Sequence, residues 1–118
     1  MKDYKELMVW QKSMLLVEEV YRLVRFLPRE EIYGLSDQMR RAAVSIPSNI
    51  AEGNARESEK DFSRFLAIAQ GSNAEIETQL LICERLGYIP TEELQKACQL
   101  NEEIAKMLRS LISRLKSY

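Results

Sequence analysis

Apolar residues recur at steps of three and four along nearly the whole chain, in four segments separated by short polar breaks. This spacing places the apolar side chains on one face of an α-helix. In the first segment, one such stripe consists of Leu7, Trp10, Met14, Val17, Tyr21 and Val24. We predict a first helix that ends near Pro28 and buries this stripe in a core.

The first segment also carries a second apolar stripe, which lies about 100° away around the helix. It consists of Leu16, Val20, Leu23 and Leu27. Two stripes make the apolar surface wider than one core contact needs. We therefore predict that the second stripe, including Leu16 and Val20, contacts another subunit.

Local signals mark the ends of the second helix. It is expected to begin after Gly34, with Ser36 as its N-cap and Asp37 in its first turn, where a carboxylate complements the helix dipole. Gly53 is expected to end the helix in a left-handed conformation.

The third and fourth helices have equally clear ends. Ser58 precedes Asp61 by three residues, a weaker form of the capping box, so the third helix is expected to begin at Ser58. It is expected to run to Gly87, where Tyr88 packs back on the last turn as in a Schellman stop. The fourth helix follows Thr91, with acidic residues in its first turn and basic residues towards its end.

No segment alternates between apolar and polar residues as a half-buried strand does. Long helices joined by short connections indicate an all-α fold, an antiparallel up-and-down four-helix bundle. A length of 118 residues suits one domain, which we expect to span residues 1–118.

The stretch RRAAVSIPSNIAEG, residues 40–53, places a proline inside the second helix. Proline removes one backbone hydrogen bond and collides with the carbonyl four residues earlier, at a cost of about 3 kcal/mol. Because Ile46 and Ile50 keep one inward phase across Pro47, we predict a helix that is kinked but continuous. The alternative is that Pro47 ends the helix and a loop follows.

Small residues mark a second predicted interface. Val44 and Pro47 lie away from the inward stripe of the second helix, and the third helix carries Ala67, Gly71 and Ala74 opposite its core face. Glycine in a helix interior costs about 1 kcal/mol relative to alanine, which favours close approach of another backbone. We predict subunit packing here. A solvated face that is merely small is the alternative.

Asn73 and Asn101 occupy core positions of the third and fourth helices. Antiparallel pairing brings them within about one turn of each other. We expect either one polar layer that fixes the register of the two helices, or a position at a subunit or solvent boundary.

Charge, cysteine content and hydropathy narrow the class of protein. Lys and Arg number 17 against 18 Asp and Glu, so binding to nucleic acid requires local clustering of basic residues. Two isolated cysteines fit a reducing cytoplasm and no disulfide framework. The first ten residues do not read as a signal peptide, and no apolar run reaches about 18 residues. We expect a cytoplasmic protein with no membrane partner.

The sequence offers little for catalysis. It has no histidine, which removes the commonest general base and metal ligand. Di-iron bundles pair glutamates with histidines, and the isolated glycines form no phosphate loop. We expect no catalytic residues, no metal, no cofactor and no small-molecule substrate.

Basic residues suggest binding to nucleic acid. Candidate contacts are Arg40, Arg41, Arg56, Lys60 and Arg64, and a further cluster of Arg109, Arg114 and Lys116 lies at the end of the fourth helix. The alternative is that these side chains form ordinary surface ion pairs.

The run RRAAVSIPSNIAEG and the later run FSRFLAIAQGSNAEIETQLLICERLGYI resemble the signature of four-helix-bundle proteins encoded in intervening sequences of bacterial 23S ribosomal RNA genes. The segments LMVWQKSM and KMLRSLISRL extend the likeness over nearly the whole chain. The resemblance implies a ring of five subunits and no enzymatic activity. It also implies a fold similar to the accessory variability determinant (Avd) proteins of diversity-generating retroelements, which associate with reverse transcriptase and nucleic acid.

We therefore expect a non-enzymatic homopentamer that acts as a nucleic-acid or ribonucleoprotein accessory. Its expected partners are further copies of the chain, RNA or DNA, and a reverse transcriptase or another ribonucleoprotein. The alternative is a protein-interaction scaffold that binds no nucleic acid.

Overall fold

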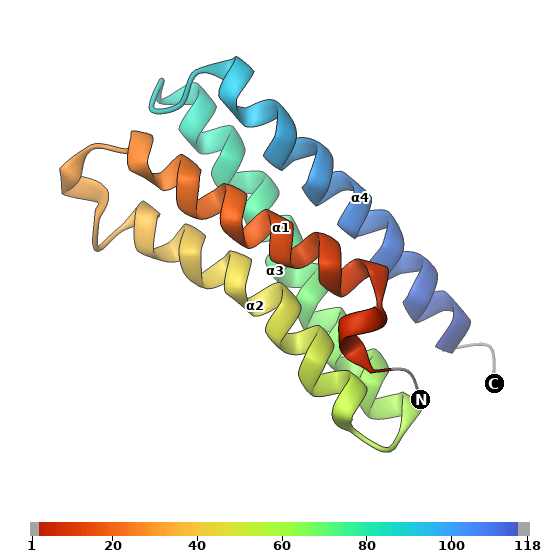
Figure 1. Cartoon of the computed structure of the whole chain (residues 1–118). Helices are drawn as coiled ribbons and strands as arrows, with labels where there is room; N and C mark the ends of the chain where they lie inside the picture. The colour runs from red at the N-terminus through yellow and green to blue at the C-terminus, as the bar shows by residue number, and fades with distance from the viewer. Residues whose placement is uncertain (1–2, 116–118) are drawn as a thin grey trace.

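The computed structural model describes residues 3–115, which form four long helices and no strand (Figure 1). Short 3-10 helices lie before α1 (η1, Tyr4–Glu6) and between α1 and α2 (η2, Val24–Phe26; η3, Arg29–Glu31). The all-α prediction is confirmed. The long helices are α1 (Met8–Leu23), α2 (Leu35–Ala55), α3 (Glu59–Arg85) and α4 (Thr91–Leu115).

Each helix packs against two neighbours, so the four form a closed bundle. α1 contacts α2 and α4, and α3 contacts the same two helices from the other side, which leaves α1 and α3 diagonal to each other. Ser45 of α2 pairs with Ser72 of α3, and Gly53 further along α2 meets Phe65 earlier in α3. Residue numbers therefore rise along α2 as they fall along α3, as antiparallel packing requires.

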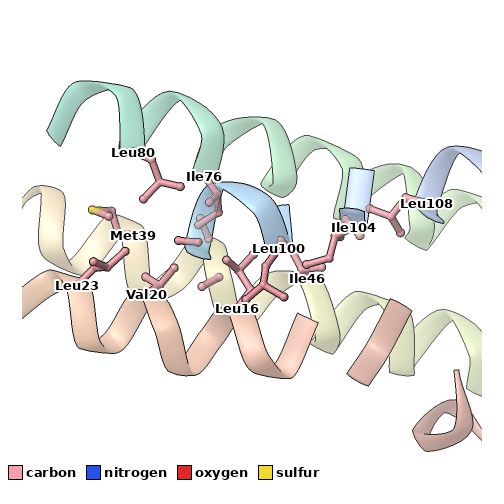
Figure 2. Packing of buried hydrophobic residues seen from close by; sticks show 14 of the residues in the cluster. Leu16, Val20, Leu23, Met39, Ile46, Ile76, Leu80, Leu100, Ile104 and Leu108 are labelled. Carbon is pink, nitrogen blue, oxygen red and sulfur yellow. The ribbon is translucent and has the colours of Figure 1, made fainter. Parts of the chain in front are cut away.

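The stripe of α1 that was predicted to contact another subunit is the one that faces the core. Leu16, Val20 and Leu23 are each 0% exposed and point into the bundle, towards α2, α3 and α4 (Figure 2). Met14 and Tyr21, from the stripe predicted to be buried, remain 38% and 45% exposed. The prediction that Leu16 and Val20 contact another subunit is therefore wrong. Both stripes are apolar, and only the position of α1 between α2 and α4 decides which one is enclosed.

The second helix continues through Pro47, so the loop alternative is wrong. Pro47 itself is buried, beside Trp10 and Val17 of α1, which line the same groove. Its predicted place on an outer surface is therefore wrong as well. Proline has no N–H to satisfy, so it can be enclosed here without an unpaired donor.

Gly53 has a different role from the predicted helix stop. The helix runs on to Ala55, and Gly53 is buried within it. A Cβ atom at Gly53 would lie 2.7 Å from the Cβ of Phe65 and 3.0 Å from the Cδ1 of Phe62. Glycine is required because α3 approaches α2 too closely for any side chain.

The start of α2 also differs from the prediction. Gly34 is the N-cap, and Ser36 lies inside the helix and is buried. The Leu35 N–H donates instead to Oε1 of Glu31, at 3.1 Å, so a carboxylate from η3 satisfies this first-turn donor. Ser36 fits the local N-cap pattern, whereas the hydrogen bond from Leu35 to Glu31 depends on how η3 folds against the start of α2.

The predicted ends of α3 are confirmed. The Asp61 N–H donates to Oγ of Ser58, at 3.0 Å, as an N-cap requires. At the other end Gly87 has φ 71°, and the Tyr88 N–H donates to the Cys83 carbonyl at 2.9 Å. This bond, from the residue after Gly87 back to the last turn of the helix, is the mark of a Schellman motif.

The predicted polar layer between α3 and α4 is also present. Asn73 Nδ2 donates to Oδ1 of Asn101 at 2.6 Å and to its backbone carbonyl at 2.9 Å. Asn101 Nδ2 donates to the Asn73 carbonyl at 3.0 Å. Both residues are buried, and a shift of either helix would leave these groups without partners.

We expect Asn101→Leu to lower the free energy of unfolding by about 1–3 kcal/mol, because the Asn73 amide loses its side-chain acceptor in a buried position. Urea denaturation of the purified protein measures this effect. The double variant Asn73→Leu with Asn101→Leu is the control: it removes both polar partners, and we expect it to cost less than the single variant. A double variant less stable than the single one would contradict this explanation.

Candidate interaction surfaces

An apolar groove of about 290 Å³ lies on the outside of the bundle between α1 and α2. Tyr4 and Trp10 meet edge to face at one end of it, with ring centroids 5.5 Å apart. Val44 is 40% exposed, like its neighbour Met14. We call the exposed and half-buried residues that line and extend this groove the α1–α2 surface: Trp10, Met14, Val17, Tyr21 and Val44.

A second apolar surface follows α3. Ala67, Gly71 and Ala74 are exposed as predicted, and a Cβ atom at Gly71 would meet nothing within 4 Å. No other backbone of the same chain explains this glycine, so the subunit contact stays a prediction. Larger exposed side chains flank the small ones, and together they form the α3 surface: Ala67, Ile68, Gly71, Ala74, Leu81 and Ile82.

Next to α4 the α3 surface continues into a groove of two adjoining hollows, about 680 and 550 Å³, which share Gln70 and which Ala67, Ala74 and Leu81 of the α3 surface also line. Lys60 and Arg64 line the smaller hollow, while Lys106 and Arg109 line the larger one. Lys106 is not among the predicted contacts. Its spacing of three residues from Arg109 and the register that Asn73 and Asn101 set between α3 and α4 are the signals from which it could have been predicted.

The five predicted nucleic-acid contacts fall into two groups. Arg40 and Arg41 lie in the first half of α2, while Arg56 is its C-cap. Sixteen residues of helix separate Arg40 from Arg56, or about 24 Å. Arg56, Lys60 and Arg64 therefore form one basic site at the turn between α2 and α3, and the first two arginines do not belong to it.

Phe65 packs against both arginines of this basic site and was not among the predicted residues. The guanidinium carbons of Arg56 and Arg64 lie 5.1 and 5.2 Å from the centroid of its ring. Such cation–π contacts hold the two guanidinium groups in place. A phenylalanine one residue after Arg64 and nine after Arg56 gives no sequence signal, because the contact depends on the turn that folds α3 back on α2.

Most of the predicted arginines also form ion pairs with carboxylates of their own helix or cap. Arg41 pairs with Asp37 at 2.9 Å, Arg56 with Glu52 at 3.1 Å and Arg64 with Asp61 at 3.6 Å. Arg40 donates to the Ile32 carbonyl at 3.4 Å. Exposed pairs of this kind contribute at most about 1 kcal/mol, so a phosphate can replace the carboxylate at small cost.

The family model described as "23S rRNA-intervening sequence protein" matches residues 5–110. The chain belongs to this family. No curated protein matches the sequence.

A solved structure extends the family assignment to the fold. It is the crystal structure of a protein with unknown function from the S23 ribosomal protein family of Bacteroides thetaiotaomicron VPI-5482. The two chains are 32% identical and superpose with a TM-score of 0.81, over 88% of this chain and 97% of the other. The fold of this 23S rRNA-intervening sequence protein is therefore shared with a solved relative.

Within residues 3–115, no three His, Cys, Asp or Glu side chains lie together as a metal site requires. None of the helices described is both long enough and apolar enough to cross a bilayer. Lys116, part of the predicted cluster at the end of α4, lies outside the described residues.

The two cysteines of this family member differ in their environment. Cys83 is buried, and burial raises the pKa of its thiol to about 11. Cys98 is exposed in the groove between α3 and α4, where partial desolvation and the carboxylates of Glu84, Glu77 and Glu102 raise the pKa of its thiol.

We expect one cysteine per folded chain to react with a thiol reagent at pH 8, and more slowly than free cysteine. The thiolate is the reactive species, and a raised pKa lowers its fraction at this pH, so the rate should climb as pH rises. Absorbance of the released thiol product measures the rate for the folded protein and the rate for free cysteine. Cys98→Ser should remove this reaction, while Cys83 should react only after denaturant is added. Rapid labelling of both cysteines in the native protein would contradict the assignment.

Proposed function

We propose that this protein is a non-enzymatic accessory that assembles with further copies of itself, as a ring of five subunits, and binds nucleic acid through basic sites on the assembled ring. Its cellular partner in this proposal is RNA or DNA, with a reverse transcriptase or another ribonucleoprotein. The proposal places the protein in the cytoplasm.

Self-assembly is supported by the apolar side chains outside the core. Ile68 and Leu81 are about half exposed on α3, and Met14, Tyr21 and Val44 are exposed on the other side of the bundle. Single exposed apolar residues are ordinary, whereas contiguous patches mark interaction sites. Val44 and the stripe of Ala67, Gly71 and Ala74 therefore remain our interface candidates, and Trp10, Met14 and Tyr21 join them.

The observation that carries the nucleic-acid part is the pair of guanidinium groups of Arg56 and Arg64 over the ring of Phe65, with Lys60 next to Arg64 in the smaller hollow between α3 and α4. Two guanidinium groups held over one ring are ordered before a ligand arrives, which lowers the entropy cost of binding phosphates. A net charge of −1 gives one subunit little attraction for a polyanion. Repetition around a ring multiplies the contacts without changing the charge of each site.

The second candidate is a protein-interaction scaffold that binds no nucleic acid. The ion pairs of Arg41, Arg56 and Arg64 with neighbouring carboxylates favour it, because paired arginines are the usual state of a solvated helix surface. Under this alternative the same apolar surfaces bind protein, and the arginines contribute solubility.

We expect light scattering of the purified protein at micromolar concentration to give about five times the protomer mass of 13.7 kDa. Exposed apolar surface on every copy drives the association. A monomer at this concentration would overturn the assembly part of the proposal, and a stable species with another number of subunits would overturn the pentamer alone.

We expect binding to single-stranded RNA or DNA at about 50 mM salt, with an affinity that falls steeply as salt rises, because counterions are released from the phosphates. Fluorescence anisotropy with labelled oligonucleotides measures both the affinity and the salt slope. Replacing Arg56, Lys60 and Arg64 with Gln should weaken binding by about tenfold or more and flatten the slope.

The matched control replaces Arg29, Arg85 and Lys96 with Gln, since these two arginines and one lysine are also exposed and lie away from the turn between α2 and α3 and outside both apolar surfaces. It removes the same charge and should change binding much less. Equal losses in both variants would mean that total charge matters and the proposed site does not. No binding at about 50 mM salt would favour the scaffold.

A further inference from the structure

Two apolar surfaces lie on different sides of one bundle. The α1–α2 surface faces outwards between α1 and α2, and α3, which carries the other surface, is diagonal to α1. Ala67 and Ala74 of the α3 surface line the groove between α3 and α4, whereas the α1–α2 surface lies over the other two helices, so the two surfaces occupy different sides of the bundle. A single chain cannot cover either of them with the other.

The two surfaces differ in relief. Large side chains stand on the α1–α2 surface, where Met14, Tyr21 and Val44 are 38–45% exposed. The α3 surface has Ala67, Gly71 and Ala74 along its middle and larger residues such as Ile68 at its sides. With no atom within 4 Å of a Cβ at Gly71, this middle strip has room for the large side chains of the other surface.

Two copies of the same surface do not fit each other in shape. Two α1–α2 surfaces would oppose large side chains to large ones, and two α3 surfaces would leave a gap over the small residues. Voids forfeit dispersion contacts, so a paired large and small surface packs better than either like pair.

The dimensions of the bundle permit a stable contact. Its Cα atoms span 46 × 24 × 20 Å, so a long side offers roughly 1,000 Å², and a standard interface buries about 800 Å² on each partner. One long side is therefore large enough for a specific contact between two copies.

We propose that the α1–α2 surface of one copy packs against the α3 surface of a second copy, head to tail. Met14, Tyr21 and Val44 of the first copy cover Ala67, Gly71 and Ala74 of the second. This inference rests on the self-assembly proposed above and adds which surfaces meet. A contact between unlike surfaces leaves one of each kind free on a pair, so the chain extends until a ring closes. A twofold dimer would have no such free surfaces.

Two variants, each blocking one surface, test the pairing. Val44→Arg puts a charged side chain on the α1–α2 surface, and Gly71→Arg does the same on the α3 surface. Both positions are exposed, and arginine has a good helix propensity, so each protein should fold. Circular dichroism checks this first. Leu15→Arg, at an exposed leucine outside both surfaces, is the matched control and should assemble like the wild type.

Light scattering should find each blocked variant alone as a monomer of 13.7 kDa, because no complete pair of unlike surfaces remains. An equal mixture of Val44→Arg and Gly71→Arg should give a species of twice that mass, since each protein supplies the surface that the other lacks. The mixed dimer should stop there, with both remaining surfaces blocked.

Other results separate the two proposals. A monomeric wild type overturns both the assembly and this inference. If the wild type assembles, two results overturn the head-to-tail contact alone. In the first, one blocked variant still assembles, as a contact between like surfaces would allow. In the second, the mixture of the two variants stays monomeric.

Discussion

The register between α3 and α4 is fixed by three hydrogen bonds between Asn73 and Asn101 inside an otherwise apolar layer. Apolar side chains tolerate sliding by a turn, because any apolar neighbour replaces another at modest cost. A buried amide tolerates no such shift, because each lost partner costs about 1–3 kcal/mol. The polar layer therefore decides which residues face each other across the groove, and so brings Lys106 and Arg109 into line with Lys60 and Arg64.

The other close constraint is the crossing of α2 and α3. Gly53 lets the backbones approach where any side chain would collide with Phe65. The same approach places Phe65 beside Arg56, because the turn that follows folds α3 directly back along α2. One packing requirement in the core thus creates the arrangement of guanidinium groups on which the proposed nucleic-acid site depends.

The exterior combines weak charge with substantial apolar area. Arginines pair with carboxylates of their own elements, so one subunit presents a nearly neutral surface. Binding of a polyanion by such a protein depends on repetition, and repetition depends on the apolar surfaces of α1, α2 and α3. Assembly and nucleic-acid binding are therefore linked in this proposal, with the first required for the second.

Local patterns along the chain were enough to predict the four helices, the continuity of α2 through Pro47 and the ends of α3 at Ser58 and Gly87, because each rests on local periodicity or short-range hydrogen bonding. The same patterns placed Asn73 and Asn101 at core positions but left open whether the two residues pair. The packing of the helices, and not the local pattern, settles which stripe of α1 is core, why Gly53 is needed and which basic residues meet. Leu16 and Met14 are equally apolar, and Arg56 and Arg64 are separated by a turn. Their burial and contacts depend on where the neighbouring helices lie, and the pattern of side chains along one helix does not specify the positions of its neighbours.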